Sequence, residues 1–411
     1  MRGRTPLAGL WCIICMALAC EEAEIGPLIE VVDSAGIRVY EVDLDRAPAS
    51  MRLDSSPVWT FGGLESPGTH EPFYLVVDAH LGSDSMLYVA EWSTQSIIAV
   101  DPRVGKAVRF GKSGDGPGEF RALSSVHPPG AETGRITGFD RRNFRLTTFD
   151  SSGHVVSIVP VPRPTALGGI QELHLSGDKT TFLLEISSLP APGQSIGEYR
   201  PVTPVLMIKE RMDTITWVLG QAVYNYREGV GALVYGAEPV AAAGVDGLWL
   251  GDSGEPVLWH WASATATVDR IVRWTMRGRA ITAAGREALG SALLDELGVE
   301  ELAARRRVLA VLQWADQLPA FGAVLESSCG RYVWIGSRFA PRQGIKAVTP
   351  RGWLVVDLEQ PGAARLEVPE GFRILQVVDG LVVGLHVDSL GVETLRAYRV
   401  EAMHDPSRGR G

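Results

Sequence analysis

Four acidic residues occupy the same place in a recurring sequence motif, each at the end of an apolar run that predicts a β-strand. They are Glu91, Asp140, Glu185 and Asp252. A carboxylate in this position can accept hydrogen bonds from the free N–H groups of the following turn. If the four converge, they would instead form an oxygen-rich site of the kind that calcium occupies. We favour the turn-capping interpretation and therefore expect no cofactor, with calcium as the alternative.

Trp92 directly follows Glu91, and an indole at that position could stack on a sugar or a peptide. Together with the four carboxylates, Trp92 makes up a candidate binding rim. Most tryptophans of the second half lie within strand patterns, where we expect them to fill the core between sheets.

An apolar strand followed by a small or acidic residue recurs six times along the chain. The copies begin at Leu87, Ile136, Thr181, Leu248, Val333 and Leu381. Successive copies start 49, 45, 67, 85 and 48 residues apart, and three of these spacings match the roughly 40 to 50 residues of a four-stranded propeller blade. Turn formers alternate with β-branched and aromatic residues around the copies. The pattern predicts an all-β fold, a six-bladed β-propeller.

The most specific part of the repeat extends from Phe61 to Val159. Phe110-Gly111 is followed there by Gly114-Asp115-Gly116-Pro117-Gly118-Glu119-Phe120, and later by Asp140-x-x-Asn143-x-Arg145 and Phe149-Asp150-x-x-Gly153. These motifs resemble the inter-blade loops and blades of propellers built from NHL-like repeats. The chain as a whole is similar to the bacterial six-bladed propeller lipoproteins. The resemblance implies a propeller without an established catalytic activity.

The main alternative to a binding protein is an enzyme with the propeller fold. Metal-dependent lactonase and lyase propellers build their sites from Asn and carboxylates, or from several His. This chain has only two asparagines, Asn143 and Asn225, and its histidines lie singly, without His-x-His or His-Glu-x-x-His spacing. They are His70, His80, His127, His154, His174, His260, His386 and His404. We expect most of them at the surface or in turns. Nucleophile-elbow, phosphate-loop and dinucleotide motifs are also absent from the sequence, so no catalytic residue and no metal ligand is assigned.

Chain ends and insertions complete the expected architecture. Residues 372–400 offer only three strands, whereas Val58 to Phe61 has the signature of an outer strand without a blade of its own, so we predict that it completes the last blade. Residues 277–318 have helix-forming composition and are expected to be an inserted cover on a blade edge. The Pro- and Gly-rich segment 187–204 is expected to be a surface loop. The expected propeller spans residues 28–402, followed by a flexible tail of residues 403–411.

The N-terminus predicts export. Arg2 and Arg4 precede an apolar run of about a dozen residues, shorter than the roughly 20 of a spanning helix, so residues 1–19 are a signal peptide. The run ends in Ala17-Leu18-Ala19-Cys20, which resembles a bacterial lipobox and predicts a lipidated Cys20 on a short tether of residues 20–27. An ordinary signal peptidase could cut the same bond and would leave a freely secreted protein. Cys12 and Cys15 belong to the signal, so Cys329 has no partner for an intramolecular disulfide.

Composition limits the partners. The formal net charge of −9 at pH 7 disfavours nucleic acid. We therefore expect a protein in the cell envelope, anchored by lipid to a bacterial membrane and facing the periplasm or the exterior, that binds a protein, a peptide or a glycan. The alternative is a cation-dependent hydrolase or lyase with its site at the central channel. The lining of that channel is the feature that would separate the two functions.

Overall fold

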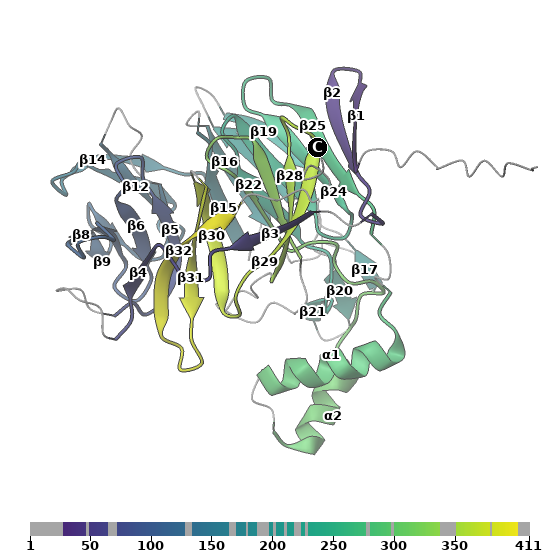
Figure 1. Cartoon of the computed structure of the whole chain (residues 1–411). Helices are drawn as coiled ribbons and strands as arrows, with labels where there is room; N and C mark the ends of the chain where they lie inside the picture. Colours follow the sequence, from purple (N-terminus) through teal and green to yellow (C-terminus); the bar gives the residue numbers. More distant parts are fainter. Residues whose placement is uncertain are drawn as a thin grey trace, which may run out of the picture.

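The computed structural model describes residues 28–46, 49–64, 72–127, 134–163, 170–177, 180–186, 197–199, 203–208, 212–217, 223–226, 229–276, 280–296, 300–337, 351–378 and 380–401. The predicted signal peptide, Cys20 and the C-terminal tail lie outside these residues. The described part is an all-β arrangement with two helices set apart from the sheets (Figure 1).

Most described strands form four-stranded antiparallel meanders that follow one another along the chain. The first is made of β5 (Val76–Leu81), β6 (Leu87–Glu91), β7 (Ser96–Val100) and β8 (Ala107–Phe110). The second is made of β11 (Leu123–His127), β12 (Ile136–Asp140), β13 (Arg145–Phe149) and β14 (Val155–Pro160). The third is made of β15 (Ile170–Leu175), β16 (Thr181–Ile186), β18 (Thr203–Ile208) and β19 (Met212–Trp217).

Three further meanders follow, and strands from the N-terminal part of the chain extend them. The first is made of β22 (Pro239–Ala243), β23 (Gly247–Asp252), β24 (Val257–Ala262) and β25 (Thr267–Trp274), with β2 (Ile37–Val42) and β1 (Ile29–Ser34) added at its edge. The second is made of β26 (Ala323–Glu326), β27 (Tyr332–Gly336), β28 (Gly352–Asp357) and β29 (Gly362–Glu367). The last is made of β30 (Phe372–Val378), β31 (Leu381–Val387), β32 (Glu393–Glu401) and β4 (Trp59–Gly62). Strand β3 (Ala49–Leu53) joins the last two meanders into one sheet by pairing with both β29 and β32.

The predicted pairing of the chain ends is confirmed. Strand β4 pairs antiparallel with β32, with Phe61 opposite Leu395. The sequence did not predict that earlier strands would cover two other edges: β2 runs parallel to β25, and β3 runs parallel to β29. These additions satisfy backbone groups that an open edge would leave free.

The recurring sequence motif corresponds to the second strand of each meander. Every residue of β6 and of β23 is buried, because each of these strands is covered on both faces by neighbouring sheets. Tyr88 and Ile97 of the first meander, for example, share a core cluster with Leu123 and Phe149 of the second. Burial on both faces explains why the motif is a continuous apolar run and not an alternating one.

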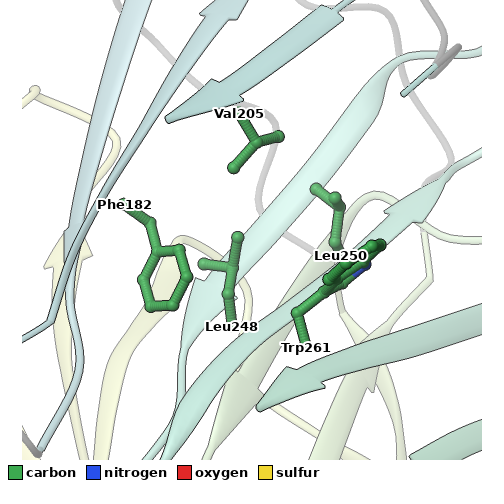
Figure 2. A pocket seen from close by; sticks show the side chains of 5 residues that line it. All are labelled: Phe182, Val205, Leu248, Leu250 and Trp261. Atoms are coloured by element: carbon green, nitrogen blue, oxygen red, sulfur yellow. The ribbon is translucent and has the colours of Figure 1, made fainter. Parts of the chain in front are cut away.

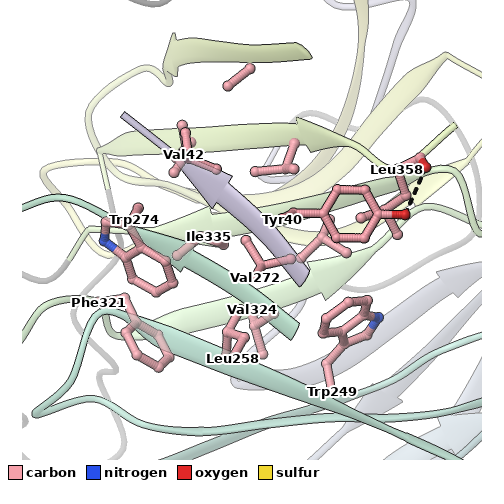
Figure 3. Packing of buried hydrophobic residues seen from close by; sticks show 14 of the residues in the cluster. Tyr40, Val42, Trp249, Leu258, Val272, Trp274, Phe321, Val324, Ile335 and Leu358 are labelled. Atoms are coloured by element: carbon pink, nitrogen blue, oxygen red, sulfur yellow. Dashed lines mark hydrogen bonds between the residues drawn. The ribbon is translucent and has the colours of Figure 1, made fainter. Parts of the chain in front are cut away.

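The N-terminal hairpin is fixed by a core that several sheets share (Figure 3). Tyr40 of β2 is fully buried, and its hydroxyl donates a 2.8 Å hydrogen bond to the carbonyl of Leu358. Around it pack Trp249, Trp274 and Phe321, from the fourth meander and the segment that leads into the fifth. Trp249 and Trp274, like Trp334 and Trp353, are at most 6% exposed, so the predicted core role of these tryptophans is confirmed.

An apolar residue followed by glycine stands at the end of two outer strands, at Phe61-Gly62 in β4 and at Phe110-Gly111, where β8 ends. Gly62 and Gly111 have φ of +92° and +77°, which residues with a side chain rarely adopt. A Cβ on Gly111 would also lie 2.6 Å from the ring of Phe120, and one on Gly62 would lie 2.7 Å from the ring of Phe73. The apolar-Gly pair therefore permits both a left-handed turn and the close approach of an aromatic ring from the following loop.

Two smaller sheets and two helices complete the described structure. The sheets are β9 (Lys112–Ser113) with β10 (Glu119–Phe120), and β17 (Gly197–Tyr199) with β20 (Val223–Tyr226) and β21 (Gly229–Ala232). Strand β17 falls within the stretch that was expected to be a loop.

The helical insertion predicted for residues 277–318 is present as α1 (Ala283–Glu296) and α2 (Leu302–Val311). Figure 1 shows both helices on one side of the sheets, and the cover of a blade edge stays a prediction. Trp314, which follows α2, stacks on Tyr235 and attaches the insertion to the sheets. Neither described helix is long and apolar enough to cross a bilayer.

Candidate functional site: a polar cluster on the innermost strands

Asp140 caps a turn. Its side chain is fully buried, and its carboxylate accepts hydrogen bonds from the backbone N–H groups of Arg121, Ala122, Arg142 and Asn143 at 2.9 to 3.1 Å. Because both carboxylate oxygens are engaged by backbone donors, this arrangement is the one that the turn-capping interpretation describes.

Glu91 occupies the corresponding place in the first meander and is 2% exposed. It accepts hydrogen bonds from the backbone N–H of Tyr74, at 3.2 Å, and from the hydroxyl groups of Ser93 and Thr94. Trp92, beside it, is partly exposed.

Asp252 is 5% exposed and accepts a 2.8 Å bond from the N–H of Gly254. Glu185 belongs to β16, but its side chain lies outside the described residues. Across the part of the chain that is described, His, Cys, Asp and Glu side chains form no group of three that could hold a metal ion.

A second set of polar residues lies on the innermost strands. Strands β5, β11 and β15 are the first strands of three successive meanders, and Figure 1 places β5 and β15 in the interior and β8 and β14 at the periphery. Each of these first strands carries a polar residue, an apolar residue and a histidine in that order: Asp78 to His80, Ser125 to His127, and Glu172 to His174. Adjacent members are 47 residues apart in the sequence.

The strand register shows that the three histidines are equivalent. His80 is opposite Tyr88, His127 is opposite Thr137, and His174 is opposite Phe182. Each partner lies three residues before the acidic end of its own strand. We call the six residues Asp78, His80, Ser125, His127, Glu172 and His174 the channel cluster.

Asp78 joins the first two meanders within this cluster. One carboxylate oxygen lies 3.1 Å from Nε2 of His80, and the other accepts a 2.9 Å hydrogen bond from the N–H of Val126. Burial opposes ionisation of Asp78, but the charge and the hydrogen bond of His80, together with the bond from Val126, outweigh it and lower the pKa of Asp78 to about 2. The side chains of Asp78 and His80 remain 19% and 27% exposed, so solvent reaches this pair.

The histidines of the cluster are in unlike environments. Burial alone would lower the pKa of His80, but the charge and the hydrogen bond of Asp78 raise it above its usual range. Burial and the positive charge of His80 lower the pKa of His127 to about 4, with Asp78 opposing and His174 adding a smaller repulsion. At neutral pH His127 is therefore a neutral imidazole, next to a histidine that favours the protonated form.

Two further contacts define the cluster. Nε2 of His127 lies 3.4 Å from the hydroxyl oxygen of Ser125, at the limit of a hydrogen bond. Nε2 of His174 is buried without a hydrogen-bond partner and lies 3.7 Å from a carboxylate oxygen of Glu172.

Arg373 of β30 approaches the cluster from the last meander. Its guanidinium donates a 3.1 Å hydrogen bond to the carbonyl of Val76. The negative charges of Asp78 and Glu393 attract it. Burial lowers the pKa of Arg373 despite these two carboxylates.

The expectation that most histidines would lie at the surface or in turns is wrong for this cluster and for His260, which is fully buried. His154 does lie in an exposed turn, with its side chain 82% exposed. The signal that could have identified the cluster is the 47-residue repeat of a polar residue, an apolar residue and His, which is far longer than the local spacings of common metal motifs.

A different ionisable group lies between the fourth and fifth meanders. A carboxylate oxygen of Glu326 accepts hydrogen bonds from Nε1 of Trp249, at 3.0 Å, and from the N–H of Val245, at 3.2 Å. Its other oxygen is buried without a partner. Burial and the charge of Asp246 outweigh these bonds and the charge of Arg270, and raise the pKa of Glu326 to about 7.

We predict that Glu326→Gln stabilises the protein at high pH. A carboxyl whose pKa is raised on folding weakens the folded state as pH increases from its ordinary value of 4.5 to about 7, and the neutral amide avoids this loss. The shift corresponds to at most about 3 kcal/mol, and partial exposure reduces the expected gain to about 1 to 2 kcal/mol at pH 8. Urea unfolding at pH 5 and pH 8 measures the effect.

The matched control is Glu359→Gln, because the Glu359 side chain is 67% exposed. It should leave unfolding nearly unchanged at both pH values. An equal effect of Glu326→Gln at pH 5 and pH 8 would show that the ionisation of Glu326 is not the cause.

The pocket in Figure 2 is apolar and lies between the third and fourth meanders. Its lining residues are Phe182, Val205, Leu248, Leu250 and Trp261. The space between these side chains is too small for a water molecule. It is a packing gap between sheets and not a ligand site.

Comparison with known proteins supports the fold. A member of the DUF4221 family from Bacteroides vulgatus is 11% identical, with a TM-score of 0.52 over 86% of this chain and 99% of its own. The chain has a β-propeller-like, all-β fold. A putative exported protein from Bacteroides fragilis is 10% identical, with a TM-score of 0.45 over 89% of this chain and 100% of its own. An inactive virginiamycin B lyase from Staphylococcus aureus, solved with quinupristin, is 7% identical, with a TM-score of 0.38 over 79% and 84% of the two chains.

Of these three similarities, only the first exceeds a TM-score of 0.5, and at 11% identity it indicates a common fold and no more. No family model matches the sequence, and no curated protein does.

Proposed function

We propose that the chain is an exported, six-bladed β-propeller that binds a protein, a peptide or a glycan. Six successive meanders support the blade count, and the β4–β32 pairing supplies the fourth strand of the last one. The bridging strand β3 is then a connection between the outer edges of two blades. Repeats of the NHL-like type account for three of the five spacings between the second strands.

The channel cluster is the feature of the structure that best supports a binding function. Three innermost strands present the same polar pattern, whereas Glu91 and Asp140 are occupied by turn hydrogen bonds. Partly exposed polar side chains that converge from several strands are typical of a binding site. The ligand would contact this cluster first, and Trp92 at the rim would be a second point of contact.

Purified protein from residue 28 onward, screened against peptide and glycan libraries, tests the proposal. We expect ligands whose affinity falls at least about tenfold in His127→Gln, because the site loses an imidazole that contacts the ligand. His154→Gln, which alters an exposed turn, should bind as the wild type does. Ligands that lose affinity only in Trp92→Ala would move the site to the rim, and a library without ligands would contradict the proposal.

The alternative function is a hydrolase or lyase in the channel. It is favoured by one observation: two neighbouring imidazoles whose pKa values are displaced in opposite directions, with Asp78 orienting His80. Such a pair can supply a general acid and a general base. Turnover of a library member that is lost in both His80→Gln and His127→Gln would replace the binding function by this one, and its dependence on an added divalent cation would test the cation-dependent form.

We also propose that Cys20 carries lipid and anchors the protein to a bacterial membrane. Two or more acyl chains give stable attachment, since each buried CH₂ contributes about 0.8 kcal/mol. In a bacterial host, wild type should partition into detergent, whereas Cys20→Ser should be exported and soluble. A wild-type protein that is soluble after export would contradict the anchor and indicate a freely secreted propeller.

A further inference from the structure

The channel cluster is rich in hydrogen-bond donors. Nε2 of His80 is committed to Asp78, which leaves Nδ1 for a ligand, and the protonated form that Asp78 favours has a hydrogen on both nitrogens. Ser125 adds a hydroxyl, and His127 and His174 each add an imidazole N–H. A ligand that fits these groups presents acceptor oxygens.

The nearby carboxylates do not cancel this preference. Both oxygens of Asp78 are engaged, one by His80 and the other by the N–H of Val126. Glu393 accepts bonds from the N–H groups of Leu75 and Val76, at 2.9 and 2.8 Å. Glu172 faces His174 on the third meander, 3.7 Å away. Arg373, which approaches Asp78 from the last meander, adds a positive charge.

The geometry points to an anion site in which His80, Ser125 and His127 bind the oxygens of a carboxylate, phosphate or sulfate group. This inference rests on the proposed binding function and gives its ligand a chemistry: an acidic peptide or an acidic glycan. Binding is coupled to proton uptake, because the anion faces an imidazole that burial and a positive neighbour keep neutral.

The coupling has a defined direction. The negative charge of the ligand opposes both causes that lower the pKa of His127 from its usual value to about 4. An opposite charge within hydrogen-bond distance raises a histidine pKa by about one to three pH units. His127 should therefore gain a proton when the anion binds. A rise of about two pH units would make the affinity fall by about tenfold between pH 5 and pH 7, and a rise of about one unit by about twofold.

The experiment uses the protein with labelled histidines and inorganic phosphate as the first probe. NMR follows the ring signals of His80, His127 and His154 against pH, with and without phosphate. We expect phosphate to raise the His127 pKa by about one pH unit or more and to leave the ring signals of His154, in its exposed turn, unchanged. Calorimetry in two buffers of different ionisation heat should show proton uptake that is lost in His127→Gln and kept in His154→Gln.

Two further comparisons test whether the anionic group belongs to a peptide or to a glycan. An alanine dipeptide with a free carboxyl terminus is compared with its amide, and glucuronate is compared with glucose. A shift of His127 by the dipeptide acid alone assigns the site to peptides, and a shift by glucuronate alone assigns it to acidic glycans.

The anion site would be overturned if none of the anions moved the His127 pKa, or if His127→Gln took up as many protons as wild type. Ser125→Ala, which preserves the imidazoles, provides a second variant if His127→Gln does not fold, and should weaken phosphate binding at least about threefold. Failure of the library screen with a positive phosphate result would leave the anion site standing and refute only the macromolecular ligand. If neutral forms of the library ligands bound as well as their anionic forms, the anion site would be refuted and the binding function would stand.

Discussion

Asp140→Ala is expected to lower the free energy of unfolding by about 3 to 5 kcal/mol, because it leaves buried N–H groups without an acceptor. The carboxylate is fully buried and receives hydrogen bonds from four backbone N–H groups that belong to the segments before β11 and after β12. Water cannot replace these bonds at a position with no exposed surface. Chemical unfolding of the variant measures the loss.

Asp150→Ala is the matched control. Asp150 also caps a turn, through the N–H groups of Ser152 and His154, but its side chain is 41% exposed, so water can replace the lost bonds and the variant should unfold nearly as the wild type does. Millimolar calcium should leave the melting temperature of the wild type unchanged. A calcium-dependent rise that disappears in Asp140→Ala together with Asp252→Ala would show instead that the rim carboxylates hold a cation.

Removal of residues 1–62 is expected to abolish cooperative thermal unfolding. The deletion takes away β4, whose Phe61 packs in the core shared by the first and last meanders, and it exposes the edge of β32. It also removes β2 and β3 from the edges of β25 and β29, and with β2 the buried hydrogen bond of Tyr40 to Leu358. Loss of a closing strand opens the ring and leaves apolar surface and strand edges exposed.

A chain that begins at residue 28 is the matched control, because it lacks the export segment but keeps all four N-terminal strands. It should melt in a single transition by calorimetry. The expected result for the longer deletion is a broad transition with a small enthalpy, or aggregation. If both chains melt alike, the pairing of the chain ends does not stabilise the fold.

Local chemistry made the strands and turns predictable. Leu87 to Glu91 and Ile136 to Asp140 were expected to be strands and coincide with β6 and β12. Gly62 and Gly111, at the ends of two outer strands, have the positive φ that glycine adopts readily. Each of these features depends on neighbours within a few residues, so its physical cause is visible in a short stretch of sequence.

The channel cluster was not predicted, because its members come together only when the meanders are arranged side by side. The 47-residue repeat marks His80 and His127 as equivalent positions, but the sequence alone does not bring the two side chains into one site. Against the effect of burial, the pKa of His80 is raised by Asp78, and the pKa of His127 is lowered by burial and by the charge of His80. The burial and the His80 charge that act on His127 come from the tertiary structure and not from a local pattern. The same holds for Glu326, whose raised pKa follows from the loss of solvent between two sheets.

The sequence by itself determined the strand class, the turn chemistry, the helical insertion and the pairing of β4 with β32, since these follow from periodicity, capping and an unpaired outer strand. The tertiary structure decided which edges β2 and β3 cover, where the helices lie, and which polar side chains meet on the innermost strands. The physical reason is the range of the forces involved. Propensity and capping act over a few residues, whereas burial and electrostatic coupling depend on groups that the fold brings together from distant parts of the chain.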